Sequence, residues 1–174
     1  MSVNLELTPC ESMADLRRHL ANVPRSLLVG GDSEAPRGFF IINVAVEAPL
    51  VIGLCVSGMG PHPRVLWQAK LGRVLIGADC TVTSVDVRAG KIGASIRLDG
   101  AFFDFLLPDE NGAAVVHELG AMGIGFDGVV RWSVSSDDVV ENFRIEAGRV
   151  LELDVVDAAG PLRVSLAEGR VLKS

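Results

Sequence analysis

The chain has 174 residues and carries 16 Lys and Arg against 22 Asp and Glu, which gives a net charge of −6 at neutral pH. This length fits one domain with a sizeable core, and a content of 49% hydrophobic and 22% charged residues excludes an intrinsically disordered chain. Every apolar stretch is shorter than the roughly 18 residues of a membrane span, and the acidic balance argues against nucleic acid or an anionic membrane as a partner.

The first predicted elements are a short strand and one helix. Residues 3–7 alternate apolar and polar side chains, as a half-buried strand does. Thr8 and Glu11 fit a capping box with Pro at the first helical position. Apolar residues then recur at helical spacing: Met13, Leu16, Leu20 and Val23. Because Pro24 ends this pattern, we predict a helix over about residues 9–22.

The rest of the chain indicates a succession of short strands. Val and Ile are frequent, and Gly recurs at the short intervals that are typical of tight turns. Closely spaced turns favour an antiparallel meander over a parallel sheet with crossover helices. The predicted strands are 39–47, 49–57, 64–70, 73–79, 81–87, 91–98, 101–107, 113–119, 122–126, 129–134, 139–147, 149–156, 161–166 and 170–173.

An internal repeat with a period near 40 residues organises these strands. Three strand–turn–strand segments align with one another: 84–92, 125–132 and 164–172. The strands that precede them align as well: 73–77 with 113–117 and 149–153, and 101–105 with 139–143. A period of this length with about four strands is the size of one propeller blade.

An acid, a Gly, a Lys or Arg and a Trp recur in these segments at similar spacing. Gly128 precedes Trp132 by four residues, and Pro63 precedes Trp67 by the same interval, while Ala94 stands where a third Trp would be. This pattern resembles the blades of pyrroloquinoline-quinone-type β-propeller repeats. The resemblance implies a blade-like meander without the quinone, because nothing in the sequence matches the cofactor or metal residues of those enzymes.

The resemblance covers about residues 60–174 and sets the expected architecture. Residues 39–174 hold about three such units, whereas a closed propeller typically has at least four blades. We therefore expect one all-β domain over residues 1–174, an open or partly closed antiparallel meander of about three blade-like units with one N-terminal α-helix. The strand and helix of residues 1–38 are the natural cover for an open sheet edge. Pairing of two copies as a homo-oligomer is the alternative.

Motifs for catalysis, cofactors and metals fail when they are tested against their context. Residues 123–128 spell GxGxxG, but a strand is predicted after them, where a dinucleotide site requires a helix. Neither a Walker A motif nor a nucleophile elbow is present. His19, His62 and His117 fall in different predicted elements and give no metal-ligand spacing. We assign no catalytic, cofactor-binding or metal-binding residue and expect no cofactor, which favours a non-enzymatic role.

The cysteines indicate the compartment. Cys10, Cys55 and Cys80 are odd in number and far apart, so they form neither a disulfide framework nor a zinc motif. Residues 1–30 lack the basic start and apolar block of a secretory signal. The cysteine usage is typical of a reducing environment. Together with the missing secretory signal, it leads us to expect a cytoplasmic protein of bacterial type.

Negative charge is concentrated in one segment. Residues 99–141 contain nine acids and a single base, Arg131. Two acidic turns lie within this segment: Asp109 and Glu110, and Asp137 and Asp138. We expect these turns to lie near each other on one rim, where they could bind a basic protein. Oxygen-rich turns can also bind Ca²⁺, although neither turn has EF-hand spacing.

These observations favour a non-catalytic module that binds another protein, and one specific form is an acidic inhibitor or immunity-type protein that masks a basic effector. Two alternatives stay open. One is a small-molecule- or metal-binding protein, or an enzyme, with its site in the arc of sheets or in the loop 57–63. The other is a structural subunit of an assembly. Fold analogy does not choose among them, because one fold serves many functions.

Overall fold

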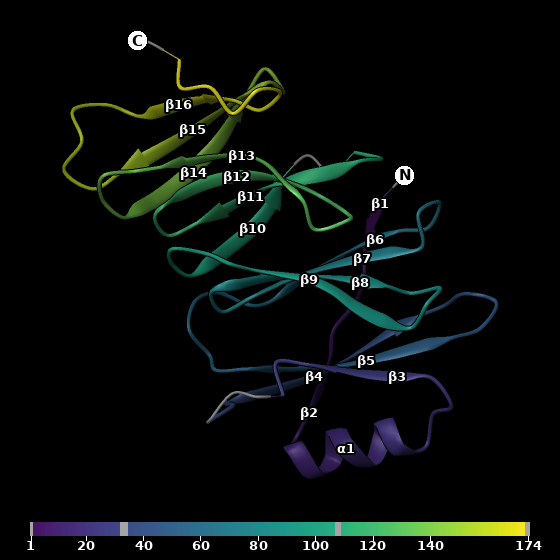
Figure 1. The fold of residues 1–174 in the computed structure, drawn as a ribbon. Helices are drawn as coiled ribbons and strands as arrows, with labels where there is room; N and C mark the ends of the chain where they lie inside the picture. Colours follow the sequence, from purple (N-terminus) through teal and green to yellow (C-terminus); the bar gives the residue numbers. More distant parts are fainter. Residues whose placement is uncertain (1, 32–34, 107–108, 173–174) are drawn as a thin grey trace.

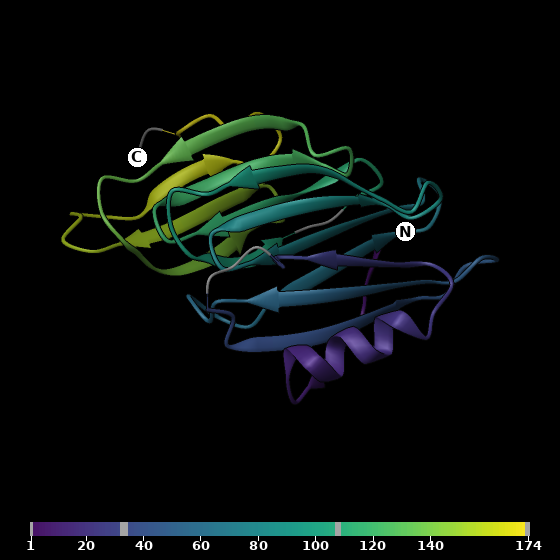
Figure 2. The ribbon, with the colours of Figure 1, turned by 60° about the horizontal axis from the view of Figure 1, so that its bottom comes forward.

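Four β-sheets lie face to face in a stack, and helix α1 (Met13–Ala21) covers one end of it (Figures 1 and 2). The computed structural model describes residues 2–31, 35–106 and 109–172. The ends of the predicted strands 101–107 and 170–173 therefore lie outside the described residues. The prediction of an all-β fold with one N-terminal helix is confirmed. Within the described residues the sheets do not close into a barrel.

We number the sheets in the order of the stack, starting from the helix. The first sheet contains β2 (Thr8–Cys10), β4 (Gly38–Val44), β5 (Leu50–Val56) and β3 (Ser26–Val29). The second contains β1 (Ser2–Asn4), β6 (Arg64–Gln68), β7 (Arg73–Ala78), β8 (Thr81–Asp86) and β9 (Lys91–Arg97). The third contains β10 (Phe102–Leu106), β11 (Gly112–His117), β12 (Gly120–Gly125) and β13 (Val130–Ser135). The fourth contains β14 (Val140–Glu146), β15 (Val150–Val155) and β16 (Leu162–Ser165).

The helix begins later than its sequence predicts. Ser12 is the N-cap, and its hydroxyl accepts a hydrogen bond from the Asp15 backbone N–H at 3.2 Å. Thr8 does not cap the helix, because residues 8–10 form the edge strand β2 and pair with β4. Pro9 is tolerated there because an edge strand can lack one N–H donor. The prediction of a helix from residue 9 is therefore wrong, and Ser12 with Asp15 forms the effective capping signal.

The predicted strands from residue 39 to residue 166 are confirmed to within about two residues at most of their ends. Residues 170–173 form no named strand in the described part of the chain, only a bridge between Val171 and Val164. The strand β3 was not predicted from the sequence, and it pairs in parallel with β5. A run of four residues without alternation gives no strand signal by itself.

The repeat alignment matches positions in the sheets. The aligned segments 73–77, 113–117 and 149–153 lie in β7, β11 and β15, which are interior strands of the second, third and fourth sheets. The expected count of three units is not confirmed, because β4 and β5 pair with β2 and β3 in a sheet of their own.

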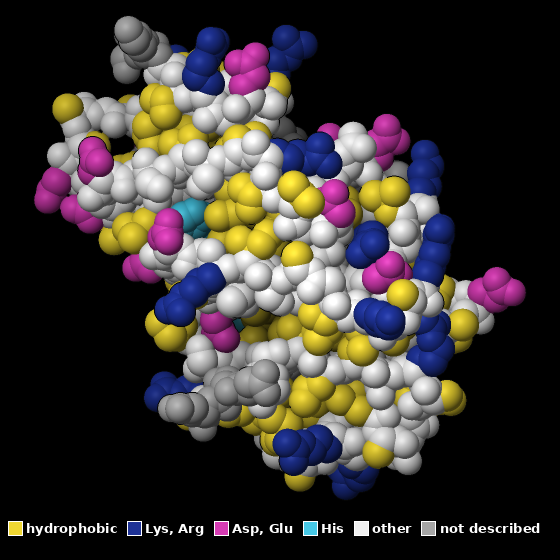
Figure 3. All heavy atoms as spheres, in the orientation of Figure 1, with side chains coloured by type: hydrophobic (Ala, Val, Ile, Leu, Met, Phe, Trp, Pro, Cys, Tyr) yellow, Lys and Arg dark blue, Asp and Glu magenta, His cyan; other side chains and the backbone are white. Residues whose placement is uncertain are grey.

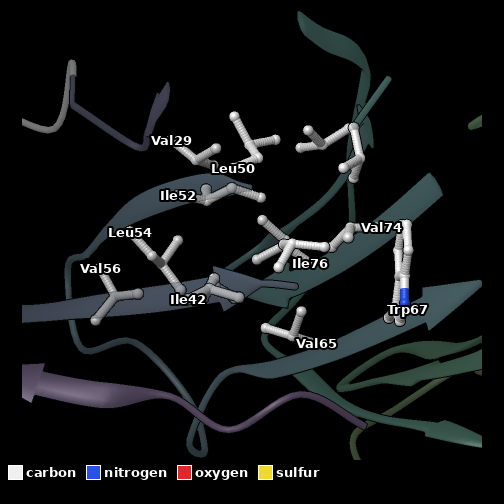
Figure 4. Close-up of a cluster of buried hydrophobic side chains, with 14 residues drawn as sticks. Val29, Ile42, Leu50, Ile52, Leu54, Val56, Val65, Trp67, Val74 and Ile76 are labelled. Atoms are coloured by element: carbon white, nitrogen blue, oxygen red, sulfur yellow. The ribbon is translucent and has the colours of Figure 1, made fainter. Parts of the chain in front are cut away.

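Three apolar layers between the sheets form the core. Figure 4 shows the layer between the first and second sheets, where Ile52 and Leu54 of β5 lie opposite Ile76 of β7. Similar layers fill the next two interfaces. Because the third sheet is covered on both faces, β11 and β12 are buried at every residue and show no alternation. By contrast, β14 alternates, because one face of the fourth sheet is exposed.

The two ends of the stack are finished differently. Leu16 and Leu20 of α1 pack on the outer face of the first sheet, and Gly53 of β5 lets the helix approach closely. A Cβ atom at Gly53 would lie 2.8 Å from a Leu20 methyl carbon. The outer face of the fourth sheet carries a row of charges across three paired strands, in which Glu152 lies between Arg144 and Arg163.

A second glycine allows the second and third sheets to pack closely. A Cβ at Gly77 of β7 would lie 2.2 Å from the ring of Phe102, which is fully buried. We expect Gly77→Ala to lower the free energy of unfolding by about 2 kcal/mol, because the ring must shift in a filled core. Urea denaturation measures this loss.

The matched control for this prediction is Gly160→Ala. A Cβ at Gly160 meets nothing within 4 Å, and its φ is not positive. This variant should be neutral or slightly stabilising. Equal destabilisation by the two substitutions would contradict the packing explanation.

Candidate protein-binding rim

The three passages of the chain from one sheet to the next after residue 56 lie on the same side of the stack. The passages 57–63, 98–101 and 136–139 each follow an even number of antiparallel strands: β4–β5, β6–β9 and β10–β13. An even number of strands returns the chain to the side from which it entered the sheet. We call this side the crossover rim. The opposite side carries hairpin turns, and we call it the hairpin rim.

Hydrogen bonds fix the first passage. The Asp79 carboxylate accepts hydrogen bonds from the backbone N–H groups of Ser57, Gly58 and Met59, at 2.7, 3.1 and 3.1 Å. Asp79 follows β7 and has a φ of 49°, a conformation that Asp tolerates better than most residues. The loop 57–63 is thus tied to the second sheet.

Backbone hydrogen bonds continue along the rim to the third and fourth sheets. The Glu118 N–H donates to the Ala101 carbonyl at 2.9 Å, and the Glu118 carboxylate accepts from the Ala101 N–H at 3.1 Å. The Glu118 carbonyl then accepts from the Val140 N–H at 2.8 Å, and the Val139 carbonyl accepts from the Val156 N–H at 2.9 Å. The connections of three successive sheets therefore form one hydrogen-bonded edge.

This edge is acidic. The four neighbouring connections 98–101, 117–120, 135–139 and 156–161 contain no Lys or Arg. Figure 3 shows acidic side chains gathered along the side of the third and fourth sheets, at the left of the view. We define the acidic rim by its five acids, of which Glu118 is half-buried and the others are exposed: Asp99, Glu118, Asp137, Asp138 and Asp157.

The structure separates the two acidic turns that the sequence singled out. Asp137 and Asp138 lie on the acidic rim, but Asp109 and Glu110 lie on the hairpin rim. The expectation that the turns are neighbours is wrong, because β10 and β13 run in opposite directions at the two edges of the third sheet.

Asp109 and Glu110 have local partners on the hairpin rim. The Asp109 carboxylate accepts hydrogen bonds from the N–H groups of Asn111 and Gly112, at 2.6 and 2.8 Å, and so shapes its own turn. Glu110 lies 3.9 Å from the Lys70 ammonium. Their charges therefore face a different, mixed environment from that of the acidic rim.

Sequence reasoning did not assign Asp99, Glu118 or Asp157 to a site. Asp157 lies outside the acidic segment 99–141, in the connection between β15 and β16. Counting the predicted strands could have placed all three acids on one rim, because in a meander every second connection lies on the same rim. Counting connections from residue 57 onward would have separated the two acidic turns as well.

A buried imidazole lies at the inner side of this rim. His117 ends β11 and is only 1% exposed, and neither ring nitrogen has a hydrogen-bond partner among the described residues. Burial lowers the pKa of His117, and the Asp99 carboxylate opposes part of that change. His117 is therefore neutral near pH 7 and does not offset the charge of the acidic rim. His19 lies on α1, beyond two sheets, so these histidines do not converge.

The lowered pKa of His117 predicts a pH dependence of stability. Because the unfolded state binds a proton more readily below about pH 6.5, the free energy of unfolding should fall as the pH is lowered from 7.5 to 5.5. One proton contributes a slope of at most about 1.4 kcal/mol per pH unit. Urea denaturation across this range should show a shallower slope for His117→Leu than for the wild type.

His62→Gln is the matched control for this titration, because His62 is exposed in the loop 57–63. A change of slope in His117→Leu that exceeds the change in His62→Gln identifies the buried imidazole as its source. Parallel pH profiles for the wild type and His117→Leu would show that the imidazole has the same pKa in the folded and unfolded states.

Other candidate features of the sequence are settled by their surroundings. The GxGxxG segment 123–128 covers the end of β12 and the turn that leads to β13, so a strand follows it, as predicted. A groove of 640 Å³ lies between the first and second sheets, and its lining includes Arg17, Asp79, Thr83 and Ser95. Among the described residues, neither acidic turn contributes to a group of side chains that could hold a metal ion.

No protein-family model matches the chain, and no curated protein matches its sequence. Within the described residues, no helix has the length and apolar composition needed to span a membrane.

Proposed function

We propose that this chain is a non-catalytic protein-binding module that docks a basic protein on its acidic rim. The observation that carries this proposal is the charge of the four neighbouring connections, which hold five acids and no Lys or Arg. An inhibitor or immunity-type protein that masks a basic effector is the specific form that we favour.

The spacing of the acids supports a shared electrostatic field. Stacked sheets lie about 10 Å apart, which is close to the Debye length of about 8 Å at physiological ionic strength. Acids on adjacent sheets therefore reinforce one another at the surface. A field of one sign steers an oppositely charged partner and accelerates its association.

The rigidity of the rim also supports docking. The connections are held by backbone hydrogen bonds within and between sheets, such as Ser136 to Leu119 in the third sheet and Val140 to Glu118 between the fourth and third sheets. A surface that is already ordered loses less conformational entropy when a partner binds. The rim therefore presents its charges in a fixed arrangement.

The test uses two variants with the same change in net charge. The rim variant carries Asp99→Asn, Asp137→Asn and Asp157→Asn. The control variant carries Glu47→Gln, Glu110→Gln and Glu168→Gln, all of which are exposed away from the acidic rim. Each protein is used for affinity capture from a lysate of the native host at low and high salt, and the retained proteins are identified by mass spectrometry.

We expect a basic protein that the wild type and the control variant retain at low salt, and that the rim variant loses. The affinity measured with that purified partner should fall at least tenfold in the rim variant and should depend less steeply on salt. A partner retained equally by both variants would contradict docking on the acidic rim. Retention of no specific protein by the wild type would contradict the binding module.

A second candidate function rests on the groove between the first and second sheets. Its volume of 640 Å³ lies in the range of small-molecule sites, and Arg17, Thr83 and Ser95 give it polar groups. A metabolite bound there would raise the melting temperature. A thermal-shift screen with Arg17→Gln as the control variant distinguishes this function, because neutralising the acidic rim should leave such a shift unchanged.

A further inference from the structure

A thiol, a carboxylate and an imidazole meet beside helix α1, two sheets away from the acidic rim. Each of Cys10, Asp15 and His19 offers one donor atom, and these three atoms lie within 4.8 Å of one another. Cys10 and Asp15 are half-buried, and His19 is exposed. Among the described residues, no other group of three or more Cys, His, Asp or Glu side chains converges in this way.

The local fold brings these side chains together. Cys10 is the last residue of β2, and Ser12 caps the helix two residues later. Asp15 and His19 are four residues apart on α1 and so share one face of the helix. A helix that began at residue 9 would place Cys10 on its own first turn, whereas the strand followed by a sharp turn sets the thiol against the helix.

One ring nitrogen of His19 lies beside two oxygens of Asp15. His19 Nδ1 lies 3.2 Å from the Asp15 backbone carbonyl oxygen and 3.7 Å from the carboxylate oxygen Oδ1. When Nδ1 donates its proton to the carbonyl oxygen, the lone pair of Nε2 is free to bind a metal ion. Such a hydrogen bond to the second ring nitrogen is the usual way in which a metal-binding His is held.

We propose that Cys10, Asp15 and His19 bind a divalent transition-metal ion, with Zn²⁺ as the best match. Zn²⁺ accepts sulfur, nitrogen and oxygen ligands at about 2.0–2.3 Å in tetrahedral geometry. Ligand atoms in such a site are about 3.3–3.8 Å apart, so donor atoms that lie within 4.8 Å of one another need to close by at most about 1.5 Å through side-chain rotation. Three protein ligands leave the fourth position for water.

The surrounding charges define what binding requires. The Arg18 guanidinium contacts the Asp15 carboxylate and lowers its pKa, so this ligand is ionised at neutral pH. Burial and the Asp15 charge raise the pKa of the Cys10 thiol. When the metal–sulfur bond forms, the S–H bond breaks and its proton passes to solvent. The positive charge of Arg18 disfavours the binding of a cation nearby. Its contact involves only part of the Asp15 carboxylate, which has a second oxygen.

The first measurement uses Co²⁺, which reports its ligands by its spectrum, on the full-length reduced protein. We expect a tetrahedral visible spectrum and a thiolate charge-transfer band that Zn²⁺ displaces. Cys10→Ser should abolish the charge-transfer band, and His19→Gln should weaken Co²⁺ binding at least tenfold. Cys80→Ser, which removes a half-buried thiol outside the cluster, should change neither.

The second measurement needs no substitution in the cluster and therefore does not depend on the folding of a variant. Alkylation of the native protein with iodoacetamide, followed by peptide mapping, compares Cys10 with Cys80 in the same molecule. Zn²⁺ should slow the modification of Cys10 at least tenfold and leave Cys80 unchanged. Arg18→Gln keeps all three ligands and removes the opposing charge, so it should tighten Zn²⁺ binding.

Three outcomes would overturn the site. The first is a Co²⁺ charge-transfer band that persists in Cys10→Ser, and the second is equal protection of Cys10 and Cys80 by Zn²⁺. The third is the absence of any Co²⁺ spectrum together with the absence of protection. None of these results bears on the acidic rim, because the cluster lies on the other side of the first and second sheets.

Discussion

The central strands of the second and third sheets are buried on both faces, and the rest of the structure depends on this double burial. A fully buried aliphatic side chain contributes about 1.5–3 kcal/mol relative to an exposed one, and three separate layers supply such contacts. Burial of both faces requires apolar residues throughout a strand, as in β11 and β12. It also requires close approach of the sheets, for which Gly77 makes room beneath the Phe102 ring.

A stack of this kind must end twice, and the chain uses a different solution at each end. Helix α1 covers the apolar outer face of the first sheet, with Leu16 and Leu20 inserted against it. The fourth sheet instead exposes a face whose cross-strand partners are charged, with Glu152 between two arginines. A polar outer face on a terminal unit keeps a stacked architecture soluble and prevents further stacking. The helix therefore ends the stack by covering an apolar face, and the ion pairs end it by making the exposed face charged.

The sequence predicted the individual strands better than it predicted which segments of the chain lie side by side. Alternation, turn residues and β-branched side chains located the strands of the last three sheets, because those signals are local. Two capping signals compete near the helix, at Thr8 and at Ser12, and only pairing with β4 decides between them. The acidic turns were identified as exposed, yet their separation follows from strand direction, which no single residue carries. Cys10, Asp15 and His19 were missed as a group because the helix was predicted to begin at residue 9, which would have placed Cys10 on the helix itself.

Each of the three passages follows an even number of strands. This number affects how such a chain can change in length. Insertion or deletion of a whole hairpin leaves every later connection on the side where it already lies. Loss of a single strand would reverse the direction of all strands that follow and carry Glu118, Asp137 and Asp157 to the opposite side. A gain or loss of two strands therefore leaves these acids on the same side of the stack, and a gain or loss of one strand does not. The crossover rim therefore keeps its chemical character when the chain gains or loses whole hairpins.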